Sequence, residues 1–343
     1  MTLGRPVTLR PCPKHMTYGP CGGVAADGSC EIDPLPCPFV ERPLVHWPGA
    51  APDDAVSPQG RELLAIAARR PLVVSQLPAA PFDIASLDAC ADLLRGATDA
   101  VLTGDAATAR VHFPPAYRAL LARERGLRVW AGLNCRDRNR VALEAELAAL
   151  AHAGAAAVHC VTGDHTSSGG RPDARPVFDL EGVTLVPRAR ALGLLTSVAE
   201  SPSAPPVGLR PGRLAEKVKA GAQAVLLQYC GDVSDVADFV AAARDVGVHI
   251  PVLPGVPVVV DREGAELVAS FAAAVLPAGF LDSVLDARDP FTAGVEAALG
   301  YARGLMGVDG VAGVVLAGGA AAGAEQLLAR AIAEVGRALG AGT

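Results

Sequence analysis

From Arg61 onward the chain alternates two kinds of segment. Short runs rich in β-branched residues are followed by longer stretches of Ala, Leu, Arg and Glu, in which apolar residues recur at helical spacing. This alternation predicts repeated βα units, whose strands pair in parallel through helical crossovers. The predicted strands are Leu72–Leu77, Ala100–Thr103, Leu127–Leu133, Ala156–Thr162, Leu194–Ala199, Ala224–Gln228, Pro251–Pro254 and Val311–Ala317.

Eight βα units between residues 59 and 343 are typical of a (β/α)₈ TIM barrel. A doubly wound sheet is the alternative, but no GxGxxG follows the first strand. Aromatic residues make up only 4% of the chain, and its many small apolar residues suit helices packed on a parallel sheet. We therefore expect an α/β barrel with its chemistry at the carboxyl ends of the strands. Predicted helices include Val141–Ala153, Arg213–Ala220, Val233–Asp245, Gly264–Ala274 and Glu325–Leu339.

Residues 1–58 form a region of different character, with four of the eight cysteines and a Pro-rich linker at Pro48–Pro58. The spacing of these cysteines differs from the paired CxxC of common zinc ribbons, but four thiols suffice for one tetrahedral site. A segment so poor in apolar residues would gain its order largely from the metal. Zinc is favoured, a [4Fe–4S] cluster stays open, and scattered thiols are the plain alternative. The candidate ligands are Cys12, Cys21, Cys30 and Cys37.

The net charge of −6 and the pI of 5.7 exclude a global basic field for nucleic acid or an anionic membrane. The first residues hold no apolar run of a secretory signal, and no stretch is apolar enough to span a bilayer. We therefore expect a cytoplasmic protein whose cysteines are thiols or metal ligands. Its expected partner is a small molecule; a second copy of the chain or an electron-donating protein is left open.

Polar residues follow the third and fourth strands. Asn134 opens the segment NCRDRNR, whose three arginines precede a helix. Either they bind an anion, such as a cofactor phosphate or a folate carboxylate, or they form a surface cluster neutralised by Asp137. The fourth strand ends in Thr162, Gly163 and Asp164, which would place a carboxylate over the barrel opening. Such Gly-Asp pairs are also ordinary turns.

Five segments in register resemble the methylenetetrahydrofolate reductase family: CRDRNR, AHAGAAAVHCVTGD, PVFDLEGV, LAEKVKAGAQAVLLQ and PVLPGVP. The similarity runs from the third strand to the seventh and extends more weakly over residues 59–340. The pattern GPCGG…GxCE…C resembles a small cysteine-rich domain attached to, or partnered with, some bacterial members, where it is usually C-terminal or a separate subunit. The resemblance implies a TIM barrel that reduces 5,10-methylenetetrahydrofolate to 5-methyltetrahydrofolate with FAD or NADH as reductant.

The resemblance also assigns roles to residues. Asp164 matches an aspartate near the flavin ring and the folate pterin, which makes it a candidate catalytic and substrate-binding residue. Gln228 matches a folate-binding glutamine, and Asn134 is a further substrate candidate. Lys217 matches a lysine on the flavin phosphate, although taken alone it would read as a solvated helix residue. The remaining cofactor-binding candidates are Thr103, Arg138, Thr162 and Gly163.

Three positions depart from the family. Gln76 stands where a glutamate is thought to protonate N10 of folate, and glutamine cannot supply a proton. Thr162 replaces an arginine, and Gly132 replaces a histidine. The chain is then a divergent flavin reductase, a reductase that takes hydride directly from a nicotinamide, a folate-dependent transferase without redox chemistry, or a non-catalytic subunit. Gln76 weighs against the reductase, whereas Asp164 and Gln228 weigh against the non-catalytic subunit.

Overall fold

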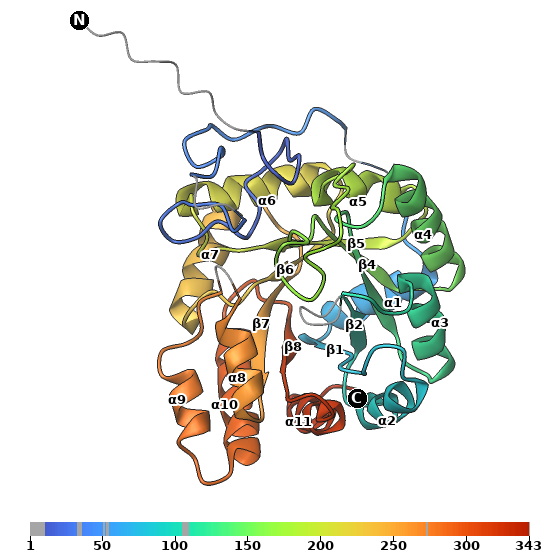
Figure 1. The fold of residues 1–343 in the computed structure, drawn as a ribbon, viewed down its shortest axis with the longest axis vertical. Coiled ribbons are helices and arrows are strands. Elements are labelled where there is room, and N and C mark those ends of the chain that lie inside the picture. Colours follow the sequence, from blue (N-terminus) through green and yellow to red (C-terminus); the bar gives the residue numbers. More distant parts are fainter. Residues whose placement is uncertain are drawn as a thin grey trace, which may run out of the picture.

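The computed structural model describes residues 11–32, 36–50, 52, 55–104, 110–271 and 274–342. Eight strands pair in chain order, all parallel, and β1 closes on β8 to complete a barrel (Figure 1). The predicted (β/α)₈ barrel is therefore confirmed. The strands are β1 (Leu72–Gln76), β2 (Ala100–Thr103), β3 (Val129–Asn134), β4 (Ala157–Val161), β5 (Leu195–Glu200), β6 (Ala224–Leu227), β7 (Val252–Val259) and β8 (Gly313–Gly319).

Helices surround the barrel and alternate with its strands (Figure 1). Three of them, α8 to α10, lie between β7 and β8. The helices are α1 (Pro58–Ala67), α2 (Ile84–Leu94), α3 (Pro115–Glu124), α4 (Arg140–His152), α5 (Gly182–Arg190), α6 (Arg210–Lys219), α7 (Val233–Asp245), α8 (Arg262–Ala269), α9 (Phe280–Leu285), α10 (Pro290–Met306) and α11 (Glu325–Ala338), with a 3₁₀ turn at Val207–Leu209.

Two predicted elements differ from the structure. The seventh strand runs five residues past the predicted Pro254, because β7 keeps pairing with β8 from Gly255 to Val259. The predicted helix Gly264–Ala274 starts and ends earlier, as α8. Residues 272–273 of that prediction, like residues 51, 53 and 54 of the predicted linker and residues 1–10 of the N-terminal region, lie outside the described residues.

Alternation along the strands divides the core in two. The larger apolar cluster joins the outer faces of the strands to the helices. The smaller one fills the barrel interior with residues such as Leu72, Trp130 and Leu195, and Leu63 of α1 packs against it at the amino-terminal end. Toward the carboxyl ends of the strands, the positions that face the barrel interior carry polar residues. These interior-facing residues, termed the mouth below, include Gln76, Gly132, Asn134, His159 and Gln228.

The N-terminal segment, residues 11–50 as far as they are described, consists of loops with two isolated antiparallel bridges, Val24 to Cys30 and Ser29 to Pro36. Gly28 has a φ of +83°, which permits the tight turn between the bridged residues. Its small core contains Met16, Val24 and Phe39, together with three of the four cysteines. In Figure 1 the segment, drawn in blue, lies across α5 and α6.

Within the described part of the chain, none of the helices has the length and apolar character needed to cross a bilayer.

Candidate active site

Gln76 lies at the end of β1, and both ends of its amide bind one residue of β8. Its Nε2 donates to the carbonyl oxygen of Gly318, and its Oε1 accepts from the Gly318 amide, each at 3.2 Å. The side chain therefore bridges the strands at which the barrel closes. A carboxylate here would face the Gly318 carbonyl oxygen without a proton to donate, so this backbone arrangement favours the amide over an ionised glutamate.

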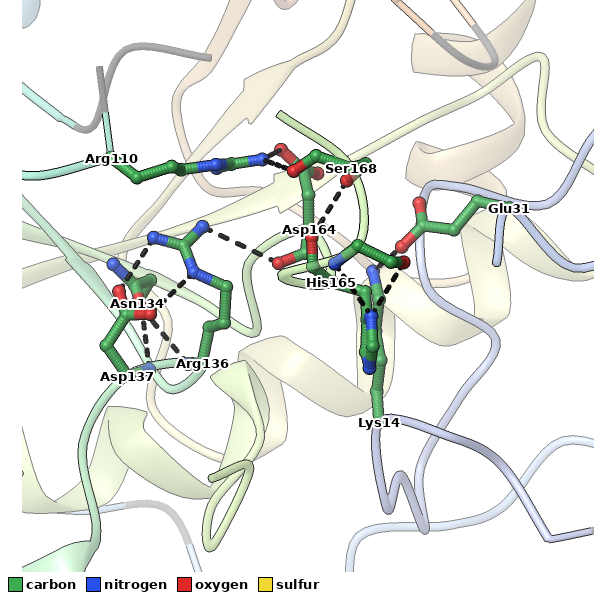
Figure 2. Close-up of polar contacts among 10 residues, drawn as sticks. Lys14, Glu31, Arg110, Asn134, Arg136, Asp137, Asp164, His165 and Ser168 are labelled. Atoms are coloured by element: carbon green, nitrogen blue, oxygen red, sulfur yellow. Dashed lines mark hydrogen bonds and ion pairs between the residues drawn. The ribbon is translucent and has the colours of Figure 1, made fainter. Parts of the chain in front are cut away.

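The loop after β4 brings Asp164 beside two arginines (Figure 2). Arg110 Nη2 lies 3.7 Å from an Asp164 carboxylate oxygen, and Arg136 donates to the Asp164 main-chain oxygen at 3.5 Å. The Arg110 side chain is only 8% exposed, whereas that of Asp164 is 63% exposed. Asp164 thus presents a carboxylate to solvent at the mouth while a buried cation lies behind it.

The segment before α4 is a loop, because the helix begins at Arg140 and is capped by Asn139. Arg136 is buried and pairs with Asp137 through two hydrogen bonds of 2.7 Å. Of the two alternatives for these arginines, neutralisation by Asp137 therefore holds for Arg136. Arg138 differs, since its Nη1 is buried with no hydrogen-bond partner among the described residues. Arg138 therefore keeps an N–H donor that could bind an anion, whereas two N–H donors of Arg136 already bind Asp137.

Two of the other predicted residues hold the loops of the mouth together. Asn134 Oδ1 accepts from the amides of Arg136 and Asp137. Thr162 Oγ1 accepts from the amide of Gly182, the first residue of α5, at 3.0 Å. Gly163 has a φ of +88°, and a Cβ there would lie 3.1 Å from the Asn134 Cβ, so glycine suits both its backbone and its space.

Two further predicted residues keep polar atoms without partners. Gln228 Oε1 accepts from the amide of Tyr229, whereas its Nε2 has no partner among the described residues and is not buried. Thr103 Oγ1, at the end of β2, is buried and has no partner in the described part of the chain. Buried or half-buried donors without partners are unusual in a finished core, and a bound ligand would complete them.

Lys217 does not lie on a solvated face, but in a buried cluster of charges around Glu200. Its Nζ binds a Glu200 carboxylate oxygen at 2.6 Å and the Ala199 carbonyl oxygen at 2.5 Å. Arg210 binds the other Glu200 oxygen at 3.2 Å, and Arg213 is also buried. The Glu200 and Lys217 side chains are 1% and 9% exposed.

Burial by itself would raise the pKa of the Glu200 carboxyl, but the surrounding cations outweigh it and lower the pKa to about 2. Burial also lowers the pKa of the Lys217 ammonium to about 8, against the opposing effect of the carboxylate. The cluster is therefore a fully desolvated charge network. Removing one charged partner from such a network lowers the stability of the protein strongly, because the remaining buried charge is left uncompensated.

The N-terminal segment docks on this network and on the start of α5. Arg210 also donates to the Cys21 carbonyl oxygen at 3.0 Å. The amides of Thr17 and Tyr18 donate to Glu181, which caps α5, at 2.8 and 3.0 Å. Because α5 and α6 begin at the carboxyl ends of the strands, the segment covers the carboxyl-terminal face of the barrel beside β4 and β5. Figure 2 shows its Lys14 and Glu31, an ion pair, next to His165.

The four cysteines of the segment are free thiols, and three of them, Cys12, Cys21 and Cys37, share its small core. Burial, and to a smaller extent the three other cysteines, raise the pKa of Cys37 to about 11. In kind, the donor set fits a tetrathiolate metal site. Among the described residues, however, no group of three or more His, Cys, Asp or Glu side chains is arranged to hold a metal ion.

The sequence interpretation missed two polar groups at interior or buried positions. Glu200 ends a strand whose other residues are apolar or small, and an acid in such a run signals a buried partner. His159 occupies an interior position of β4 between Ala157 and Val161. Residues two apart on a strand face the same side of the sheet, so the position of His159 between Ala157 and Val161 indicated that its side chain faces the barrel interior.

Residues 101–305 match the methylenetetrahydrofolate reductase family, and residues 3–42 match the family described as methylene-tetrahydrofolate reductase C terminal. No curated protein matches the chain. Among solved structures, an uncharacterised protein from Clostridium thermocellum, described as binding two copies of 5-methyl-5,6,7,8-tetrahydrofolic acid, has a TM-score of 0.53 at 12% identity, covering 79% of this chain and 97% of that chain. A 2,3-dimethylmalate lyase gives 0.47 at 12% identity over 80% of both chains. At these identities the likeness to solved structures shows a shared fold alone.

We predict that Glu200→Gln destabilises the protein by about 3–5 kcal/mol at pH 7, because it leaves buried cations without their carboxylate. Glu62→Gln, which breaks the exposed pair with Arg128, should cost about 0–1 kcal/mol. Since the folded-state pKa of Glu200 lies below its unfolded value, its contribution is present above about pH 4.5 and is lost as the pH falls toward 2. Urea unfolding of all three proteins at several pH values measures this; equal losses in the two variants would contradict it.

Proposed function

Since this chain belongs to the methylenetetrahydrofolate reductase family, we propose that it reduces 5,10-methylenetetrahydrofolate to 5-methyltetrahydrofolate at the mouth of its barrel. The observation that carries the proposal is the family match over residues 101–305, which includes both Asp164 and Gln228. The folate that the Clostridium thermocellum protein is described as binding supports a folate ligand here.

Folate recognition is proposed to rest on Gln228 and Asp164. The free Nε2 of Gln228 is a donor for a pterin oxygen or nitrogen, and the exposed carboxylate of Asp164 is an acceptor for the pterin amino group and ring N–H. Arg138, with its unpartnered Nη1, is proposed to bind an anionic group, either a glutamyl carboxylate of folate or a cofactor phosphate. Asn134, Thr162 and Gly163 hold the loops that carry these groups.

Flavin does not fit at Lys217 as the family resemblance would have it. The ammonium is already bound to Glu200 and a main-chain oxygen, and the Lys217 side chain is only 9% exposed. A flavin phosphate would have to displace this carboxylate. We therefore propose that a reduced nicotinamide such as NADH is the direct reductant. Thr103, whose buried hydroxyl lacks a partner among the described residues, is retained as a contact of this co-substrate.

The reaction adds one hydride to the methylene carbon on N5, breaks its bond to N10 and delivers one proton to N10. When bound, the nicotinamide supplies the hydride. Gln76 supplies no proton, and both ends of its amide are occupied by Gly318. Water must protonate N10, or the open iminium form of the substrate must be captured from solution. The residues of the chain then act by orienting the pterin toward the hydride donor and by holding the closing strands together.

We propose that Cys12, Cys21, Cys30 and Cys37 bind one structural zinc ion, with a [4Fe–4S] cluster as the alternative. The four thiols come from one short segment, three of them from its small core, and a divalent ion would offset their mutual repulsion once deprotonated. Ligation requires the four sulfurs to draw closer than they lie in the structure. The metal would then stabilise the segment that rests on Glu181 and Arg210.

We predict that Gln228→Ala weakens binding of 5-methyltetrahydrofolate by about 1–3 kcal/mol, because the pterin loses a hydrogen-bond partner in the mouth. Gln223→Ala is the matched control, since Gln223 precedes the same strand at its opposite end. Isothermal titration calorimetry on the two variants and the wild type tests the difference. Wild-type affinity in Gln228→Ala would remove this residue from the site.

We predict that Gln76→Glu raises NADH-dependent reduction of methylenetetrahydrofolate, because a general acid is worth about 10²–10⁴-fold in rate. The Gly318 carbonyl should keep the new carboxyl protonated, as an acid must be. Gln76→Leu, which removes the bridge to β8 without adding an acid, should give no gain. Turnover is followed by NADH absorbance, with and without added flavin.

Three results at position 76 would change the interpretation. Robust wild-type turnover that Gln76→Glu abolishes would mean that glutamine itself suits the chemistry. No hydride transfer in any variant, despite folate binding, would favour the non-redox transferase. A requirement for added flavin would overturn the direct nicotinamide reaction.

We predict about one equivalent of zinc in protein purified without added metal, and a parallel loss of zinc and thermal stability in Cys21→Ser. Cys90→Ser is the control, because this buried thiol lies in α2 and far along the chain from the segment. It should retain its zinc even where it costs stability. Iron in the protein together with a visible absorption band would indicate the [4Fe–4S] cluster. Wild-type protein that is folded and free of metal would contradict both the zinc and the cluster assignment.

A further inference from the structure

His159 is an interior residue of β4, one step deeper in the barrel than the residues discussed above. It pairs in register with Gly132 of β3 and with Ser197 of β5. At Gly132 a Cβ would lie 2.8 Å from the Cα of Gly104, so β3 cannot carry a side chain at this level unless the backbone moves. At this level of the mouth, the imidazole of His159 on β4 is therefore the polar side chain next to β3.

A chain of hydrogen bonds holds the ring of His159. Trp130 Nε1, which can only donate, lies 2.9 Å from Ser197 Oγ, and Ser197 Oγ lies 2.9 Å from His159 Nδ1. With its oxygen accepting from Trp130, the serine hydroxyl has His159 Nδ1 as its acceptor among the described residues. A serine hydroxyl that donates to Nδ1 leaves the single ring proton on Nε2.

The ring is neutral. Burial, together with the positive charge of Lys217 behind the strand, lowers the pKa of His159 to about 3. At physiological pH the imidazole thus offers one donor and carries no charge. Such a group suits recognition of a neutral, planar ligand edge better than proton delivery.

Nε2 is the atom that remains available. It has no hydrogen-bond partner among the described residues, and it does not belong to their buried, unsatisfied polar atoms. The ring as a whole is half-buried. An N–H that is not fully buried, on a ring whose other nitrogen lies against Ser197 and through it Trp130, is preorganised for a ligand.

We propose that His159 is a ligand-binding residue that donates from Nε2 to a carbonyl or amide oxygen of the planar ring bound in the mouth. The inference rests on the proposed function and deepens it. Two sources share this chemistry, the pterin carbonyl of folate and the carboxamide of the nicotinamide, and binding of each is measured separately.

The test compares His159→Phe, which keeps a ring but loses the donor, with His159→Gln, whose amide N–H₂ can replace Nε2. His152→Phe is the matched control, on the exposed end of α4. Calorimetry with 5-methyltetrahydrofolate and with NADH should give a dissociation constant roughly tenfold or more higher in His159→Phe for one ligand, as expected for a lost hydrogen bond. His159→Gln should restore most of the affinity for that ligand, and His152→Phe should match the wild type for both.

A second measurement does not depend on turnover or ligand. Nitrogen-15 NMR of the wild type should show His159 as the neutral tautomer protonated on Nε2, and Ser197→Ala should weaken that preference. A ring protonated on Nδ1, or charged at pH 7, would overturn the inference. Equal ligand affinities in His159→Phe and the wild type would also overturn it, whereas the proposed function would survive. If the wild type binds neither ligand, the proposed function fails and this inference fails with it.

Discussion

The buried carboxylate of Glu200 joins three parts of the molecule that the chain connects only at a distance. It ends a barrel strand, binds Lys217 and Arg210 of α6, and through Arg210 reaches the main chain of the N-terminal segment at Cys21. A carboxylate can be kept ionised inside a protein only if cations and donors replace the water it has lost. The sheet, the helix and the segment are therefore constrained together, and the shape of one side of the mouth depends on this single group.

The same network changes what the barrel can bind. A lysine whose ammonium is already paired with an internal carboxylate is a poor site for a phosphate, and the neighbouring Arg210 is in contact with the N-terminal segment. The N-terminal segment is thus part of the wall of the mouth and not an appendage. Its own small core includes three cysteines, so its contacts with Glu181 and Arg210 should depend on what those thiols bind.

The departures from the family are consistent with one another in physical terms. Gln76 is locked between β1 and β8 by a donor and an acceptor, a pair of contacts that an ionised glutamate cannot make. Gly132 lies too close to Gly104 to bear a side chain, and the neighbouring strand carries His159 at the same level. With the amide of Gln76 and the ring of His159 at these positions, the mouth is suited to orienting its ligands more than to proton delivery by a side chain.

Much of this could be predicted from the sequence. The alternation of β-branched runs with helical stretches determined a closed parallel barrel, because period-two and period-3.6 patterns are local properties of the chain. The strand ends at Asp164 and Gln228, and the cysteine-rich region, were likewise visible in the order of residues. What only the tertiary structure decided is which polar atoms already have partners: Lys217 and Gln76 are paired, whereas Gln228, Arg138 and His159 each keep a donor with no partner in the described part of the chain. Those partners come from Glu200, Gly318 and Ser197, on other strands, and no local pattern records which strands a closed barrel will bring together.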